Sequence, residues 1–357
     1  ADGSLPIIPG AAGFGMTTPA GSGRHLAQPK TRLIKVTNLN PAGPGSFRAA
    51  VETEGPRVVV FEVSGNIDFT PYEAIVIGNP YLTIAGQTAP SPGVTLKGAE
   101  LIIRADDVLV QHLRVRVGDY RDPDTPLKND KGWTQFSERD NLKVGGHQVV
   151  VDHCSFSWST DENAQSIGSE LTFRHNIFSE ALASPKHHKG KHSKGLIVLN
   201  QGEKAGRTTG QDVAVIGNLF AFVADRTPQI GGGARAAAIN NYAYGVTMKP
   251  EIGITLAEHL RHGSITASLV GNAFEQVKYP LRYVARGPTP GKVYLADFRV
   301  IDHEADGGIF SKVLDDPWHS PRTMMFESWG REKCNPFEAK VDEPPVIVPG
   351  LVIRPSE

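Results

Sequence analysis

The sequence of 357 residues lacks the features that mark several large protein classes. Its two cysteines, Cys154 and Cys334, exclude a disulfide-dense scaffold and a zinc site made of cysteine alone. With 37 basic and 38 acidic side chains the net charge is −1, so the overall charge predicts neither a nucleic-acid nor a membrane partner. No apolar run reaches the roughly 18 residues that a membrane helix needs. The composition therefore predicts an ordinary globular protein.

Turn-forming residues are abundant, because the chain contains 38 Gly and 26 Pro without a collagen period. One short amphipathic helix is predicted over 46–53, with Ser46 as its N-cap. Helical periodicity is otherwise scarce, and a first strand is expected at 33–37. Further strand-like segments follow at 57–63, 81–85, 94–96, 100–104, 107–117, 147–158, 170–178, 211–222, 236–244 and 265–275. The pattern predicts an all-β protein with many short strands.

Several of these segments resemble one another. An Asn follows each apolar run, and the steps from Cys154 to Asn176, Asn218, Asn241 and Asn272 are 22, 42, 23 and 31 residues. We interpret 22 residues as one unit, 42 as two units, and 31 as one unit with an insertion. A unit this small cannot bury its own apolar face, so the units must stack. We therefore predict a right-handed parallel β-helix.

Stacked units place equivalent side chains one above another. The aligned asparagines are expected to form a ladder at a turn, where Asn tolerates the left-handed backbone and bonds the amides of neighbouring coils. The phenylalanines that follow them are expected to stack in the core; they are Phe178, Phe220 and Phe274. The alternative for each Asn is an ordinary turn residue.

We predict a single domain over 1–357. It divides into an N-terminal cap at about 1–56, whose short helix closes the open apolar end, coils at about 57–300, and an irregular C-terminal tail at about 301–357. The chain begins at Ala1 without Met, which fits a processed, secreted protein. We expect it to be a monomer.

Acidic and amide side chains gather around 140–165. On an extended strand Asp161 and Gln165 point to one face while Glu162 points away, and Asp140 lies about one coil before Asp161. Carboxylate and amide oxygens without soft donors favour Ca²⁺ over zinc. The alternative is that these residues only fill β-helix turns.

Basic residues gather in the segment 185–194, which includes Lys189, His192 and Lys194. It is either an electropositive rim for a polyanion or a solvated loop, and its lysines make it a poor transition-metal cage. No nucleic-acid motif accompanies it. Farther on, Arg226 stands at a strand end before the glycines at 231–233, which do not form a phosphate loop because no Gly-Lys-Ser/Thr follows.

Four ordered motifs together resemble the pectate lyase family, polysaccharide lyase family 1. They are Val-Thr-Asn-Leu-Asn-x-x-Gly-Pro-Gly-Ser-Phe-Arg-x-Ala-Val (36–51), Leu-Thr-Ile-Ala-Gly-Gln-Thr-Ala-Pro (82–90), Val-Asp-His-Cys-Ser-Phe-Ser-Trp-Ser-Thr-Asp-Glu-Asn (151–163) and Arg-Thr-Pro (226–228). The similarity runs from about residue 10 to about 275. It implies a parallel β-helix, secretion, Ca²⁺, and β-elimination on an acidic polysaccharide made of uronic acids.

The resemblance also implies roles for individual residues. A calcium-binding Asp matches Asp140, and the family's Asp-x-x-x-Asp calcium pair matches Asp161 and Gln165, where an amide replaces the second carboxylate. The catalytic Arg, the family's base, matches Arg226. A substrate-contacting Lys matches Lys194.

A second substrate-gripping Arg of the family is Gln229 in this chain. We add His192 and Lys189 of the basic segment as substrate-binding candidates, either for neutralising a carboxylate or for supplying a different base.

Three alternatives stay open at this point. The loss of a carboxylate at Gln165 and of an Arg at Gln229 suits a uronate polymer other than polygalacturonate. A β-helix glycoside hydrolase would need two carboxylates across a cleft, and Asp161 and Glu162 are not expected to face the same side. The third is a β-helix that binds glycans without turnover.

Overall fold

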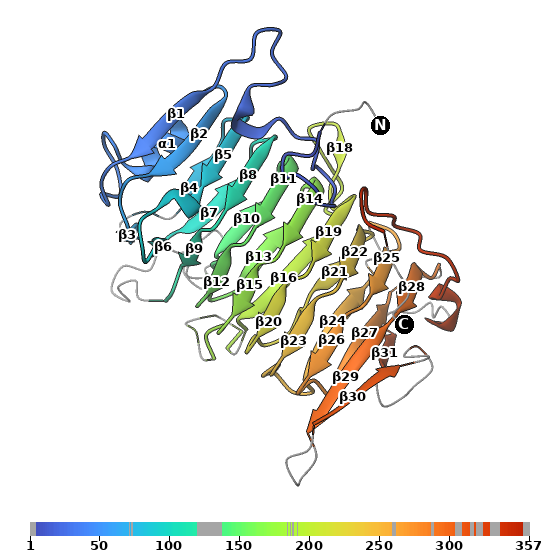
Figure 1. Cartoon of the computed structure of the whole chain (residues 1–357). Coiled ribbons are helices and arrows are strands. Elements are labelled where there is room, and N and C mark those ends of the chain that lie inside the picture. The colour runs from blue at the N-terminus through green and yellow to red at the C-terminus, as the bar shows by residue number, and fades with distance from the viewer. Residues whose placement is uncertain are drawn as a thin grey trace.

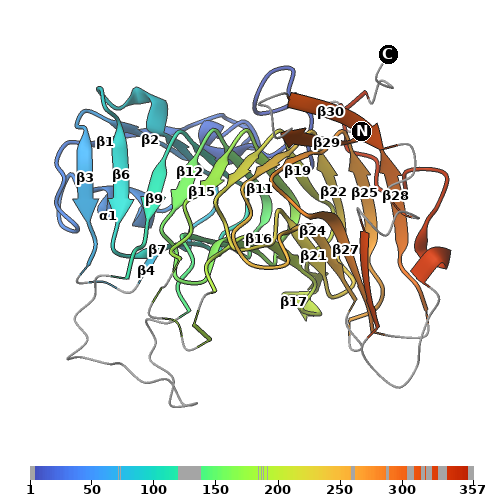
Figure 2. The same cartoon turned by 90° about the horizontal axis from the view of Figure 1, so that it is seen from below.

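The computed structural model describes residues 5–119, 138–303, 309–314, 318, 324–328 and 336–352, apart from 71, 73, 184, 186, 188, 191, 259–261 and 287–288. Within this part, three long sheets run the length of the molecule and successive coils lie side by side (Figure 1). Figure 2 shows helix α1 at one end of the row of coils and strand β28 at the other. The predicted parallel β-helix is confirmed.

Each coil crosses the three sheets in turn, and every strand pairs with its equivalent in the next coil. Sheet A contains β1 (Arg32–Val36), β2 (Arg57–Phe61), β5 (Leu82–Ala85), β8 (Val108–Gln111), β11 (His147–Asp152), β14 (Ser169–Arg174), β19 (Val213–Ile216), β22 (Arg235–Ile239), β25 (Thr266–Val270) and β28 (Lys292–Ala296). Sheet B contains β3 (Gly65–Asp68), β6 (Val94–Lys97), β9 (Arg114–Arg116), β12 (Ser155–Ser157), β15 (Ile177–Ser179), β20 (Leu219–Ala221), β23 (Tyr242–Tyr244), β26 (Ala273–Glu275), β29 (Phe298–His303) and β30 (Ile309–Leu314). Sheet C contains β4 (Ala74–Ile77), β7 (Glu100–Ile103), β10 (Leu142–Val144), β13 (Glu162–Ser166), β16 (Lys194–Leu199), β21 (Gln229–Gly231), β24 (Ile252–Ala257), β27 (Tyr279–Ala285) and β31 (Met324–Ser328).

The predicted helix is α1 (Phe47–Glu52), and the Ser46 hydroxyl accepts a hydrogen bond from the Ala49 N–H at 3.2 Å. This contact satisfies one of the amides that a helix start leaves without an intrahelical partner. Phe47 and Val51 are fully buried, and α1 contacts β1 and β4. The helix therefore covers the apolar end of the coil, as predicted.

The core confirms the predicted aromatic stack. The rings of Phe156 and Phe178 lie 5.4 Å apart, and those of Phe178 and Phe220 lie 5.0 Å apart. Ala243 occupies the next coil, and Phe274 then packs 5.4 Å from Phe298. These spacings follow the distance of about 4.8 Å between paired strands.

The predicted asparagine ladder is also present. The side-chain amide of Asn176 donates to Asn218 at 3.0 Å, Asn218 to Asn241 at 2.9 Å, and Asn241 to Asn272 at 3.0 Å. The left-handed backbone, however, falls on the residue before each Asn, for example on His175 with a φ of 52°. Asn is therefore selected for its hydrogen bonds and not for its backbone freedom.

The 42-residue step is one coil and not two. Strand β15 pairs directly with β20, so Asn176 and Asn218 lie in adjacent coils. The additional residues lie in the long turn at 180–193 and in the segment 200–212, which carries the hairpin β17 (Glu203–Lys204) and β18 (Arg207–Thr208). Turns project from the coil, so an insertion there leaves the strand register unchanged.

The prediction of an irregular tail from residue 301 is wrong in part. β30 pairs antiparallel with β29, and β31 extends sheet C beside β27. Near the C-terminus Val346 and Val348 pack with Phe14 on the outer side of sheet A. That the chain forms a single domain stays a prediction. Among the described helices, none combines the length and the apolar character that crossing a bilayer would require.

Candidate functional site

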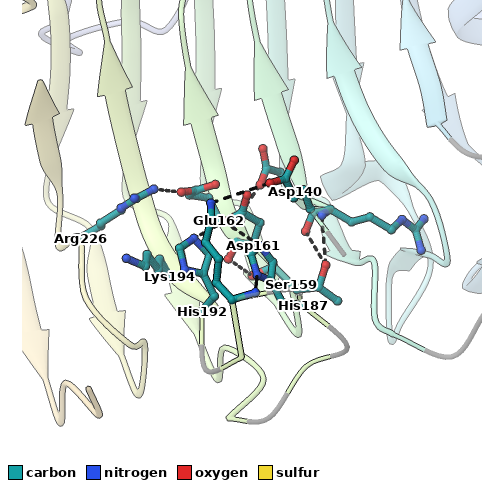
Figure 3. Close-up of polar contacts among 12 residues, drawn as sticks. Asp140, Ser159, Asp161, Glu162, His187, His192, Lys194 and Arg226 are labelled. Carbon is teal, nitrogen blue, oxygen red and sulfur yellow. Dashed lines mark hydrogen bonds and ion pairs between the residues drawn. The ribbon is translucent and has the colours of Figure 1, made fainter. Parts of the chain in front are cut away.

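Three turns of neighbouring coils meet where sheet B passes into sheet C. They span 158–161 before β13, 180–193 before β16 and 222–228 before β21. Because these three strands are hydrogen-bonded neighbours, residues far apart in sequence become adjacent. Figure 3 shows acidic and basic side chains gathered at these strand ends.

Three carboxylates form the centre of this cluster. Oxygens of Asp140, Asp161 and Glu162 all lie within 4.8 Å of one another. The expectation that Glu162 points away from Asp161 is therefore wrong. Strand β13 begins at Glu162, so Asp161 belongs to the turn and strand alternation does not apply to it.

Backbone and side-chain contacts fix Asp140. Its Oδ1 accepts the Glu162 N–H at 2.8 Å, and its own N–H donates to Glu100 Oε1 at 2.8 Å. Lys143 Nζ lies 2.7 Å from Glu100 Oε1 and 3.6 Å from Asp140 Oδ2. Burial, reinforced by the charge of Asp161, raises the pKa of Asp140 well above its usual value although Lys143 opposes the shift. A further cation would relieve this crowding of negative charge.

Two cations already pair with the other carboxylates. The Arg226 guanidinium forms an ion pair with Glu162, whose side chain is 3% exposed. His192 Nε2 lies 2.9 Å from Asp161 Oδ1. Burial alone would raise the pKa of Asp161, but the close contact with His192 and the charge of Arg226 lower it. Burial lowers the pKa of Arg226 itself, against the attraction of Asp161.

Lys194 and Asp225 complete the basic side of the cluster. Lys194 Nζ lies 3.2 Å from Asp225 Oδ2, and the Lys194 N–H donates to the Asp161 carbonyl at 2.7 Å. The backbone therefore connects the turn of Asp161 to β16, and the ammonium group stands beside Arg226 (Figure 3).

The structure does not bring every predicted residue into the cluster. Gln165 pairs in register with Lys143 and Ile197, three residues or about 10 Å along β13 from Glu162. Lys189 is half exposed and lies 3.8 Å from Glu138. Gln229 lines a separate pocket on the outer face of sheet C. Three residues of the predicted basic segment, Lys186, His188 and Lys191, lie outside the described residues, as does Cys334.

The carboxylate triad suits a hard cation. Three carboxylates offer up to six oxygens, and Ca²⁺ takes six to eight. Asp161 Oδ1 is buried and, among the residues that the structure describes, it accepts no well-oriented hydrogen bond despite the nearby His192. Glu162 supplies the carboxylate that Gln165 lacks, so the residues present fit Ca²⁺.

A second set of possible metal ligands shares Asp161. Nitrogens of His187 and His192 lie within 4.8 Å of its carboxylate, and the two rings stack 4.2 Å apart. His187 Nδ1, however, accepts the Lys189 N–H at 3.0 Å. A neutral ring with an accepting Nδ1 carries its proton on Nε2, so the nitrogen facing Asp161 has no free lone pair. This tautomer disfavours a transition metal.

Sequence reasoning missed three members of the cluster, Glu100, Lys143 and Asp225. His187 lies in the predicted basic segment 185–194, without having been named as a candidate by itself. Asp225 directly precedes Arg226, which could have indicated it. Glu100 and Lys143 gave no signal, because single charged residues on short strands are ordinary surface features.

Comparisons with known proteins show which sequences and folds this chain resembles. No protein-family model matches the chain. The chain is 30% identical over 275 residues to the "Probable pectate lyase C" of Neosartorya fischeri and 29% identical over 275 residues to that of Aspergillus terreus, 76% of this chain in each case. It spans about half of their length, 54%.

Solved structures share the fold, and one of them illustrates the match. It is a pectate lyase from Bacillus sp. N165 in complex with trigalacturonate, with a TM-score of 0.56 at 13% identity, covering 88% of this chain and 94% of the other. The predicted resemblance to the pectate lyase family is confirmed.

Proposed function

We propose that this relative of the pectate lyases cleaves a uronic-acid polymer by β-elimination, with pectate as the first substrate to test. The observation that supports it most is the meeting of three carboxylates with Arg226 and Lys194 at the positions of the family motifs. We further propose that the protein is secreted and acts as a monomer.

β-Elimination needs charge compensation beside a base. The proton to be removed is α to the uronate carboxylate, and the negative charge of that carboxylate opposes the developing carbanion. Cations around the carboxylate therefore lower the barrier. Lys194, whose ammonium group pairs with Asp225 beside the cluster, is proposed to bind the uronate. His192 and Lys189 extend the basic side from the same turn.

Arg226 is the proposed base. Its guanidinium must give up a proton before it can accept one, and burial lowers its pKa in that direction. The ion pair with Glu162 keeps the guanidinium next to the carboxylate triad. When Arg226 takes the proton, the electron pair of the C–H bond forms a carbon–carbon double bond and the glycosidic C–O bond breaks. One product therefore has an unsaturated end. The oxygen that leaves takes a proton from water and becomes a hydroxyl group on the other product.

Asp140, Asp161 and Glu162 are proposed to hold Ca²⁺. When bound, Ca²⁺ supplies neutralisation of the substrate carboxylate and so makes the adjacent proton more acidic. The sequence analysis placed Gln165 in this set, but its distance along β13 assigns it instead to the sheet face beside Lys143.

An elimination assay tests the function directly. Polygalacturonate and other uronate polymers are incubated with the protein, with Ca²⁺ and with a chelator, and unsaturated products are followed by ultraviolet absorbance. We expect product with Ca²⁺ and a loss of rate with the chelator. No product from any uronate polymer would refute the lyase function.

A glycoside hydrolase is the second candidate, because Asp161 and Glu162 do converge. Against it, Asp161 and Glu162 both face cations, and Asp140, whose pKa is raised by burial, is only 1% exposed, whereas a hydrolase needs a protonated carboxyl group that reaches the substrate. The same incubation separates the two functions, since hydrolysis gives saturated reducing ends without ultraviolet absorbance.

A further inference from the structure

A second concave site lies on the outer face of sheet C, away from the carboxylate triad. Its volume is about 280 Å³, and its polar lining residues are Asn200, Gln201, Gln229, Glu258, His262 and Arg286. The triad lies at the start of β16 and this pocket at its end, about five residues or 16 Å farther along the strand. A polymer that crosses the sheet face can reach both.

Glu258 is a buried acid at this pocket. The residue is 3% exposed, and its carboxylate accepts hydrogen bonds from the Tyr283 hydroxyl at 2.5 Å and the Arg286 N–H at 3.4 Å. Tyr283 is fully buried and is itself held by the Gly291 N–H at 3.0 Å. Buried acids are rare unless they are paired or have a role, and these contacts fix the orientation of the carboxylate.

Asn200 is a second fixed polar group. It is 8% exposed, its Oδ1 accepts the Gly202 N–H at 2.7 Å, and its Nδ2 donates to the Gly233 carbonyl at 3.3 Å. A pre-oriented amide beside a pre-oriented carboxylate loses little freedom when a ligand binds.

The glycine run at 231–233 forms part of this pocket. A Cβ on Gly232 would lie 2.8 Å from the Asn200 carbonyl oxygen, and its φ of +65° disfavours any other residue. A Cβ on Gly231 would lie 3.1 Å from the Ala257 carbonyl oxygen. The run is therefore not a phosphate loop; its glycines let the backbones of neighbouring coils lie close together beside the pocket.

We propose that this pocket is a binding subsite for one uncharged pyranose unit of the polysaccharide, held through its hydroxyl groups by Glu258, Asn200 and Gln229. The identity of the polymer rests on the function proposed above. A carboxylate accepts hydrogen bonds from two sugar hydroxyls, and amides both donate and accept. The volume suits a single sugar ring and not an extended chain.

Two charged side chains of the pocket act on a uronate in opposite directions: Arg286 would attract it and Glu258, which is buried, would repel it. A free uronate would bring a second carboxylate next to a buried one, and like charges at short range in a desolvated site repel strongly. A neutral sugar or an esterified uronate avoids this cost. The polymer would then carry free uronate at the triad and an uncharged unit a few positions away.

Affinity electrophoresis tests the proposal without requiring turnover. Wild type, Glu258→Gln and Gln229→Ala are run in gels that contain polygalacturonate, methyl-esterified pectin, or a pectic polymer alternating galacturonate with a neutral sugar. Both variants should bind the last two polymers at least about tenfold more weakly than wild type. Glu258→Gln should bind polygalacturonate as well as or better than wild type. Glu170→Gln, which changes a 41% exposed side chain on β14, is the matched control and should behave as wild type.

Two results would overturn the subsite. One is that both Glu258→Gln and Gln229→Ala are retained as wild type in all three gels. Gln229→Ala is included because Gln229 is a partly exposed strand residue, so its substitution tests the subsite even if Glu258→Gln fails to fold. The other is a selective loss of polygalacturonate binding in Glu258→Gln or in Arg286→Gln, which would make this a uronate site. If the gels retain the protein in a way that depends on Glu258 but the elimination assay gives no unsaturated product, the lyase function is refuted and the subsite is still supported.

Discussion

The ion pair between Arg226 and Glu162 contributes to both stability and function, and a single variant followed by a double variant separates the two contributions. Both side chains are largely buried, 17% and 3% exposed. Removing the guanidinium leaves the Glu162 carboxylate unpaired within 4.8 Å of Asp140 and Asp161. Loss of one partner of a buried pair costs about 3–5 kcal/mol. Arg226→Ala should therefore lower the free energy of unfolding by about this amount and also abolish elimination.

The assay is urea unfolding followed by circular dichroism, beside the elimination assay. The matched control is Arg235→Ala, because Arg235 pairs with Asp212 at the surface with side chains 36% and 35% exposed. An exposed pair contributes about 0–1 kcal/mol, so this variant should stay close to wild type in stability and rate.

A double variant completes the test. Arg226→Ala with Glu162→Gln removes both charges, so most of the lost stability should return, whereas elimination should stay absent because the base is missing. The reasoning is refuted if Arg226→Ala and Arg235→Ala lose the same stability. It is equally refuted if the double variant regains elimination.

Three further predictions concern the ladder, the metal and pH. Asn218→Ala should lower the free energy of unfolding by about 2–4 kcal/mol, because it leaves buried partners in both neighbouring coils without hydrogen bonds. Asn272→Ala, at the end of the ladder, should cost less. Equal losses of the two variants in urea unfolding would contradict this. Glu162→Gln should weaken Ca²⁺ binding in calorimetry by about tenfold or more, whereas Gln165→Asp should change it little; a large gain from Gln165→Asp would return that residue to the metal site. Burial raises the pKa of Glu258 against the hydrogen bond from Tyr283. Between about pH 4.3, where the unfolded chain releases this proton, and the raised pKa of the folded protein, the folded side chain keeps the proton, and above that range it is ionised. The stability of wild type relative to Glu258→Gln should therefore fall as pH rises above about 4.3, and a rise over that range would exclude the assigned shift.

The sequence predicted the parts of this fold that repeat. Apolar residues alternate on strands of sheets A and B, and one Asn follows many of them, so the repeat pattern alone places Asn218 in a ladder and Phe220 in a core stack. Much of sheet C escaped prediction, because its strands lack the aligned Asn and Phe that mark the other repeats, and some of them carry charged residues of the site, such as Lys143 on β10. The 42-residue step was misinterpreted for a related reason: an inserted turn and a second coil add similar lengths of chain.

The sequence alone determined that Asp161, Lys194 and Arg226 belong to recognisable motifs and that acidic and basic residues occupy different segments. Only the tertiary structure decided that they meet, and that Glu162 faces Asp161. The physical reason is that side-chain direction on a strand has a period of two, whereas a turn has no period. Contacts between turns depend on how coils stack, and the same stacking forms the Glu258 pocket from β16, β21 and β24.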